Sequence, residues 1–226
     1  MKGPCLKAAY SMRRSAALRP RWVVCSVVTG IVLASVSCRS SKAPSSPTPA
    51  STLRGAVTDP AGDRLAVLGL TISPDLIAAT IDVSGGTATI VVTFARGTLE
   101  RTFTLFSVLL DTDENPATGN SGVLADGTTF GWDYSISGVN PQGSTTAQIV
   151  RALGPGQPGQ VTPAGTATVT FPNEDQARVT VPLSVIGNDD GRMNFKVNCQ
   201  QWITTSSATG VLDWMPDVGL PPGQVR

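Results

Sequence analysis

The stretch Leu76–Phe94 reads LIAATIDVSGGTATIVVTF and contains two strand-like runs on either side of a short glycine turn. In the second run, Thr87–Phe94, apolar side chains alternate with threonine and valine, so every second residue faces the same way. This period of two, in a run rich in Val, Ile and Thr, is typical of a half-buried β-strand. Ser84-Gly85-Gly86 has the length of a hairpin connection, because glycine adopts the positive φ angles of tight turns. The stretch therefore predicts two antiparallel strands.

The same alternation recurs along residues 55–226. It places four further apolar sets on one face each: Phe130, Trp132, Tyr134 and Ile136; Ala167, Val169 and Phe171; Val179 and Val181; and Met193, Phe195, Val197 and Cys199. Two runs, Leu76–Val83 and Phe103–Leu110, are more continuously apolar, as expected for strands at the centre of two packed sheets. Turn residues separate the runs. The only helical structure that we predict is a short turn at Pro182–Gly187. We predict an all-β domain, a jelly-roll-like antiparallel β-sandwich of roughly eight to ten strands.

Residues 1–37 have the layout of a lipoprotein-type signal peptide. Six basic side chains and no acidic one lie in residues 1–21, and an uncharged apolar run follows from Trp22 to Cys38. The run ends in LASVSC, residues 33–38, which resembles the lipobox of bacterial lipoproteins and marks Cys38 as the lipidation site. Residues 38–54, rich in Ser, Pro and Thr, then predict an extended tether.

These segments predict export to the bacterial cell envelope. We expect a membrane-anchored lipoprotein whose lipid is its only membrane contact. The alternative is ordinary signal cleavage and release as a soluble secreted protein. Translation starts at Met1 or at Met12, since the double arginine that follows Met12 also opens a signal peptide.

Composition excludes several classes of function. The chain has no histidine, which excludes Ser-His-Asp and Cys-His catalysis and histidine zinc sites. From Gly55 onward, 16 acidic side chains face eight basic ones, and this net charge of −8 disfavours nucleic acid as a partner. Cys199 is the single cysteine of this domain, and its place on the apolar face of a strand predicts a buried, unreactive thiol.

An acidic turn, DTDENPATG, follows one predicted strand at residues 111–119. Aspartate and asparagine occupy alternate positions here, which directs several oxygen atoms toward one point, as a hard cation such as Ca²⁺ requires. The predicted ligands of a structural calcium ion are Asp111, Asp113, Asn115 and Asp133, with Glu114 as a supplementary one. An equally supported alternative is an Asx-turn network, in which these side chains cap backbone amides without metal.

Several of these motifs together resemble a known group of domains. The motifs are LLDTDENPATG (109–119), GWDYSI (131–136), VPLSVIG (181–187) and DDGRMNF (189–195), with DPAGD (59–63) and DWMPD (213–217) near the two ends. They are similar to those of family-nine carbohydrate-binding modules and the related DOMON-like domains of bacterial secreted and surface proteins. The resemblance covers nearly all of residues 55–226. It implies a sandwich fold and a structural calcium at Asp111, Asp113 and Asp133. It does not identify a ligand for this protein.

Two tryptophans are candidates for ligand binding. Trp202 follows two glutamines at a strand end, and Trp214 lies between two aspartates in a loop-like segment. Flat aromatic faces stack on the apolar faces of sugar rings, while neighbouring carboxylates accept hydrogen bonds from hydroxyl groups. Trp132 and Tyr134 are predicted to lie in the core instead, because they alternate with Phe130 and Ile136.

We therefore predict a noncatalytic envelope protein that binds a glycan or a protein ligand. The signal, the tether and the acidic domain without a catalytic constellation all favour this function. Two alternatives stay open: a glycosidase that uses paired carboxylates, and a purely structural envelope spacer.

Overall fold

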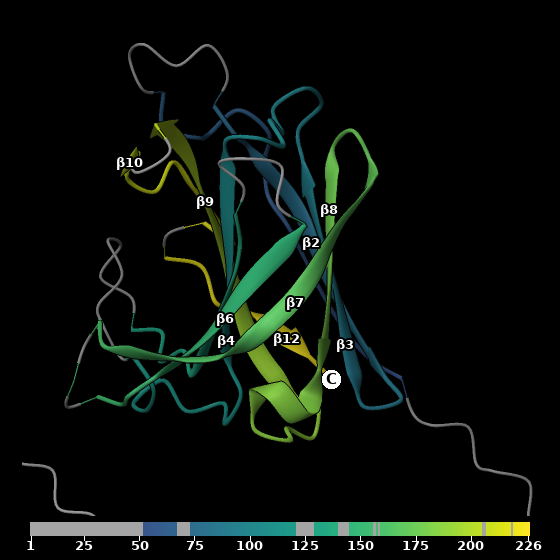
Figure 1. The fold of residues 1–226 in the computed structure, drawn as a ribbon, viewed down its shortest axis with the longest axis vertical. Coiled ribbons are helices and arrows are strands. Elements are labelled where there is room, and N and C mark those ends of the chain that lie inside the picture. Colours follow the sequence, from purple (N-terminus) through teal and green to yellow (C-terminus); the bar gives the residue numbers. More distant parts are fainter. Residues whose placement is uncertain are drawn as a thin grey trace, which may run out of the picture. The chain divides into compact units, whose positions relative to one another are not determined.

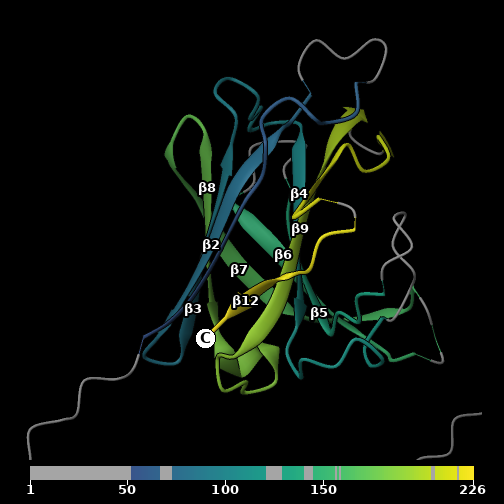
Figure 2. The same ribbon diagram turned by 180° about the vertical axis from the view of Figure 1, so that it is seen from behind.

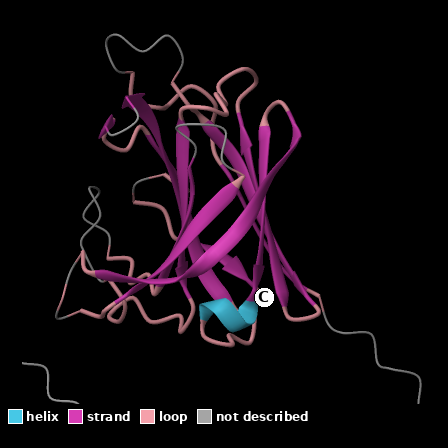
Figure 3. Cartoon of the chain, in the orientation of Figure 1, coloured by secondary structure: helices cyan, strands magenta, loops and turns pink. Residues whose placement is uncertain are grey.

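The computed structural model describes residues 52–66, 73–120, 129–139, 145–155, 157, 159–204, 207–217 and 219–226, all within the compact unit Thr48–Arg226. The predicted signal peptide (1–37), Cys38 and most of the tether (38–54) lie outside the described residues. Within them the protein is all-β, with twelve strands and one short 3-10 helix (Figure 3). The predicted all-β antiparallel fold is confirmed, and its facing halves belong to one sheet. No helix in the described ranges has the length and hydropathy that crossing a bilayer demands.

The strands form one continuous antiparallel sheet. Its order is β1 (Leu53–Thr58), β2 (Leu76–Ser84), β3 (Thr87–Phe94), β8 (Gln176–Pro182), β7 (Val161–Asn173), β6 (Thr146–Ala152), β5 (Tyr134–Val139), β4 (Thr104–Asp111), β9 (Met193–Thr204) and β10 (Ser207–Ala208). Two short strands, β11 (Asp213–Met215) and β12 (Gly223–Val225), also pair with β9, on the edge that β4 leaves free. The predicted helical turn is confirmed as η1 (Leu183–Ile186).

The sheet closes on itself, because β12 also lies against β1, the first strand of this order. The backbone N–H of Arg54 donates to the carbonyl oxygen of Arg226 over 3.0 Å, and the N–H of Arg226 donates back over 3.3 Å. Figures 1 and 2 show β2 and β3 facing β4 and β9 across a common interior. There the rings of Phe94 and Phe106 meet edge to face, with 6.4 Å between their centroids.

The core has the alternation that the sequence predicts. In β3 every second side chain, from Ala88 to Phe94, is at most 1% exposed, and in β9 the same holds from Met193 to Cys199. Cys199 is a free, fully buried cysteine, as predicted. Burial raises the pKa of its thiol, and the nearby Asp213 and Asp75 raise it further. The thiol is therefore held protonated and unreactive.

Burial differs from expectation at two places. Leu76–Val83, expected as a continuously apolar central strand, is fully buried only at some positions: Ile81 is buried, whereas Thr80 and Asp82 are partly exposed. A single closed sheet leaves the outer face of this strand uncovered. Trp132 is also only half-buried, since β5 begins at Tyr134 and a single bridge to Asn120 holds the tryptophan. Tyr134 belongs to the core, as predicted.

Candidate functional site

The predicted calcium ligands Asp111, Asp113 and Asp133 come together at one end of β9. Asp111 is the last residue of β4, and Asp133 directly precedes β5, the strand that pairs with β4. The N–H of Asp133 donates to the carbonyl oxygen of Leu110 over 2.8 Å, which fixes its position beside the end of β4. The three carboxylates each offer an oxygen atom, and these atoms all lie within 4.8 Å of one another.

Backbone and side-chain donors orient these carboxylates. The Oδ2 atom of Asp133 accepts from the backbone N–H and the hydroxyl of Thr112, both over 2.9 Å. Asp111 accepts from the backbone N–H of Asn115 and from the side-chain amide of Asn194, both over 3.0 Å. Because Asp111 is almost fully buried, desolvation raises its pKa to about 6, although the bonds from Asn194 and Asn115 lower it.

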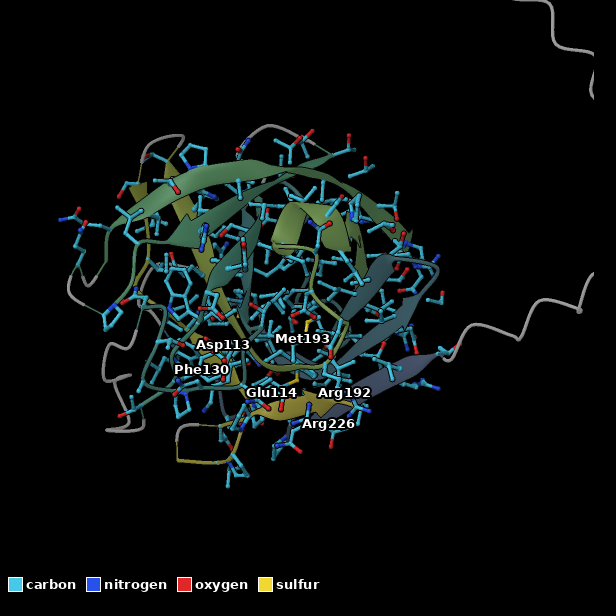
Figure 4. All side chains as sticks on the ribbon, turned by 90° about the horizontal axis from the view of Figure 1, so that it is seen from below. Asp113, Glu114, Phe130, Arg192, Met193 and Arg226 are labelled. Carbon is cyan, nitrogen blue, oxygen red and sulfur yellow. The ribbon has the colours of Figure 1, made fainter. Side chains whose placement is uncertain are left out.

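Asn115 and Glu114, the other predicted oxygen donors, also make contacts outside the group of three aspartates. The Oδ1 atom of Asn115 accepts from the backbone N–H of Ala117 over 3.1 Å, so its side chain closes an Asx turn. Glu114, held at a φ of 56°, forms an ion pair with Arg226 at 2.6 Å (Figure 4). The predicted Asx-turn network describes the aspartates as well, since Asp113 Oδ1 accepts from the N–H of Asn115 over 3.0 Å, and Asp111 and Asp133 also accept backbone N–H groups. The same three carboxylates have the oxygen-rich geometry of a cation site, so both predicted alternatives fit this geometry.

A cavity of about 480 Å³ lies beside this cluster. Its wall includes Asp113, Asp133 and Asp189, together with Arg151 and Tyr134. Burial raises the pKa of Asp189 to about 6, and the charges of Asp190, Glu114 and Asp133 raise it as well. The described lining of this cavity therefore combines a negative potential with the cationic side chain of Arg151.

A second group of aspartates lies further along β9. Asp213 of β11 pairs with Cys199, whereas Asp111 pairs with Asn194, so the two groups are separated by five residues of β9, roughly 17 Å. This second group contains two sets of three carboxylates that share Asp63: Asp59, Asp63 and Asp217, and Asp63, Asp75 and Asp213. In each set the oxygen atoms lie within 4.8 Å of one another.

The sequence did not single out this group as a ligand site. The only signal was the Asp-x-x-x-Asp spacing shared by residues 59–63 and 213–217, which the family resemblance placed at opposite ends of the domain. The structure brings them together because β11 pairs with β9 and lies against β2, whose first residue is held by Asp213. That contact is a hydrogen bond of 2.7 Å from the N–H of Leu76 to Asp213 Oδ2.

Trp214 lines a cavity of about 470 Å³ next to this second group. The other walls come from Asp63, Asp213 and Asp217 and from apolar side chains including Leu65 and Leu212. The predicted ligand-binding residue Trp214 thus stands beside three carboxylates.

Trp202, the other predicted ligand-binding residue, does not line this cavity. It lies near the end of β9 and is half-buried, and its indole N–H is buried without a hydrogen-bond partner among the described residues. The structure therefore separates the two tryptophans into different environments.

No protein-family model matches the chain, and a comparison with curated proteins gives no match. The resemblance to family-nine carbohydrate-binding modules stays a prediction, and the function has to be inferred from the residues of this protein.

Proposed function

We propose that this protein is a noncatalytic, exported β-sandwich of the bacterial cell envelope that binds a glycan at the Trp214 cavity. The observation that carries the proposal is the placement of Trp214 beside Asp63, Asp213 and Asp217 in one cavity wall. An indole face stacks on the apolar C–H groups of a sugar ring, and carboxylates accept hydrogen bonds from its hydroxyl groups. The cavity volume of about 470 Å³ suits a small part of a larger glycan.

Anchoring and metal binding complete the proposal. Acylation of Cys38 would hold the domain at the membrane through the tether of residues 38–54, and the net charge of −8 argues against nucleic acid as the ligand. The aspartates at the end of β4, Asp111 and Asp113, would bind a structural calcium ion together with Asp133. All the ligand atoms offered there are carboxylate oxygens, which is the donor set that Ca²⁺ prefers.

The glycan proposal is tested on an array of bacterial polysaccharides, followed by calorimetry with any hit. We expect Trp214→Ala to weaken glycan binding by about tenfold or more, because the stacking surface is lost. Trp202→Ala serves as the matched control and should retain binding, since Trp202 does not line the cavity. The reverse pattern would move the site to Trp202, and an array without any hit would favour a protein ligand or a spacer.

A carboxylate-dependent glycosidase is the second candidate. It is favoured by Asp213, whose pKa burial raises to about 6, in the range of a general acid, and by Asp63 and Asp217 in the same cavity wall. Release of reducing sugar from a bound polysaccharide, abolished by Asp213→Asn while binding persists, would establish catalysis. Binding without release of sugar supports the noncatalytic function.

A further inference from the structure

We propose that Asp59, Asp63 and Asp217 form a second divalent-cation site, which joins the segment after β1 to the segment after β11. The three side chains offer carboxylate oxygens within 4.8 Å of one another. Asp59 directly follows β1, and its backbone N–H donates to the carbonyl oxygen of Ile77 over 3.0 Å. Asp217 comes from the other end of the domain sequence. The site shares Asp63 and Asp217 with the Trp214 cavity, but cation binding does not require a bound glycan.

The first argument is a buried carboxylate oxygen without a partner. Asp59 is only 9% exposed, and its Oδ2 atom is buried without any hydrogen-bond partner among the described residues. The carboxylate receives a hydrogen bond from the backbone of Asp217, but its nearest ionisable side chains, Asp63 and Asp217, carry the same negative charge. An ionised oxygen in this position is costly unless a cation or a donor compensates it, and native proteins rarely leave such a group unsatisfied.

The second argument comes from comparison with the neighbouring set of aspartates. Asp75 receives a hydrogen bond from the N–H of Gly62 at 3.0 Å and an ion pair from Arg64 at 2.6 Å, and Asp213 receives the N–H of Leu76. The set of Asp63, Asp75 and Asp213 is therefore already compensated. In the described part of the chain, no arginine or lysine forms an ion pair with Asp59, Asp63 or Asp217. Of the two sets, the set that contains Asp59 is the one that lacks a positive charge.

Electrostatics agree with this geometry. Burial raises the pKa of Asp59 to about 7, the charges of Asp217, Asp63 and Asp213 raise it further, and a hydrogen bond from the backbone of Asp217 lowers it. A divalent cation between the carboxylates would reverse the sign of this local potential. Since the available donors are all oxygens, the chemistry favours a hard cation, and the less rigid coordination of Ca²⁺ suits three carboxylates from two chain segments better than Mg²⁺ does.

The site also reaches the Trp214 cavity, since Asp63 and Asp217 belong to its wall. A cation held by these residues would therefore lie near the indole of Trp214. This proximity provides a spectroscopic test, because tryptophan transfers excitation energy to a Tb³⁺ ion that occupies a calcium site nearby.

The test is a titration of the purified protein with Tb³⁺, with excitation of tryptophan, in an Asp113→Asn background that disables the site at the end of β4. We expect saturable Tb³⁺ emission that Ca²⁺ displaces. Asp63→Asn should weaken cation binding at least tenfold, and this exposed position tolerates the change. Trp214→Phe should reduce the emission without changing the Ca²⁺ affinity measured by calorimetry.

Asp82→Asn is the matched control, because Asp82 is an aspartate paired with Arg54 outside the site. It should leave the titration unchanged. The proposal is overturned if the Asp113→Asn protein binds neither ion, or if Asp63→Asn and Asp217→Asn bind as the parent does.

A second variant separates cation binding from folding. In the Asp113→Asn background, Asp59→Asn removes the buried charge, so it should raise the Tm in metal-free buffer and also abolish the remaining rise in Tm caused by Ca²⁺. These opposite effects distinguish a ligand from a merely structural residue. A variant that is less stable without metal and still responds to Ca²⁺ would contradict the assignment of Asp59.

Discussion

Individual aspartates of this domain are held in surroundings that oppose their charge. Asp189 lies three residues after η1, the short helix at the bottom of Figure 1. Its Oδ1 atom accepts from the N–H of Gly191 over 2.7 Å. Burial raises its pKa from 3.8 to about 6, and Asp190, Glu114 and Asp133 add to the effect. Between these two pH values the folded state binds more protons than the unfolded state, so stability falls as the pH rises from about 4 to about 6.

Replacement of Asp189 tests whether the stability of the folded state falls as the pH rises. Asp189→Asn keeps an oxygen acceptor for Gly191 and removes the charge, so we expect it to stabilise the protein above pH 6 by about 1 kcal/mol, or roughly 2–4 °C in Tm. Near pH 4 the variant and the parent should melt together, because the aspartate is then protonated in the folded state. Thermal unfolding at the two pH values measures both effects.

Asp190→Asn is the neighbouring control. Asp190 is exposed, and its Oδ1 atom accepts from the N–H of Arg192 over 2.9 Å. Its replacement should change the Tm much less at either pH. Equal effects of the two variants at high pH would show that the general negative charge, and not burial of Asp189, sets the stability.

At the scale of elements, the connection between β4 and β5 carries the predicted calcium site. The antiparallel pairing of Leu110 with Tyr134 places the residue after one strand beside the residue before the other. Gly119 is also required here, since its φ is 57° and a Cβ atom would lie 2.3 Å from the carbonyl oxygen of Trp132. The strands and this glycine therefore position Asp111 and Asp133 before any cation binds.

Calcium should stabilise this connection by binding only the folded state. At 100 times the Kd, the gain is about 2.7 kcal/mol, or roughly 5–10 °C in Tm. In an Asp63→Asn background, which isolates this site, Asp113→Asn should remove most of the gain. Glu174→Gln, a change in the exposed turn after β7, should keep it. If chelation of calcium leaves the melting curve of the Asp63→Asn protein unchanged, the connection is a hydrogen-bonded turn without metal.

For the whole molecule, stability depends on closure of the sheet where β1 meets β12. A Cβ atom on Gly55 would lie 2.6 Å from the carbonyl oxygen of Gln224 and 2.9 Å from a methyl group of Val225. Gly55→Val should therefore force these strands apart and cost about 1–3 kcal/mol, or roughly 2–12 °C in Tm. Ala56→Val on the exposed face of the same strand is the control and should be nearly neutral. Circular dichroism melts that coincide for the two variants would contradict this role of the closure.

The sequence alone determined the local properties of this protein. Alternation placed the core faces of β3 and β9, including buried Cys199, because the period of two is a property of each strand and does not depend on its neighbours. The calcium prediction at Asp111 and Asp113 was accessible for the same reason, as these residues lie close together in one turn. The contacts of the other predicted donors differ in origin: Asn115 closes a local Asx turn, whereas Glu114 pairs with the distant Arg226, which its own turn does not indicate.

Only the tertiary structure decided which distant segments meet. Pairing of β12 with β9 and its contact with β1 close the sheet, and pairing of β11 with β9 brings Asp217 beside Asp59 and Asp63. The tertiary structure also places Trp214 in a cavity wall that does not include Trp202. Strand patterns carry little information about these neighbours, since a strand with one apolar face can pair with many others. Which strands pair is decided by the packing of one common core, and that packing is a property of the whole chain.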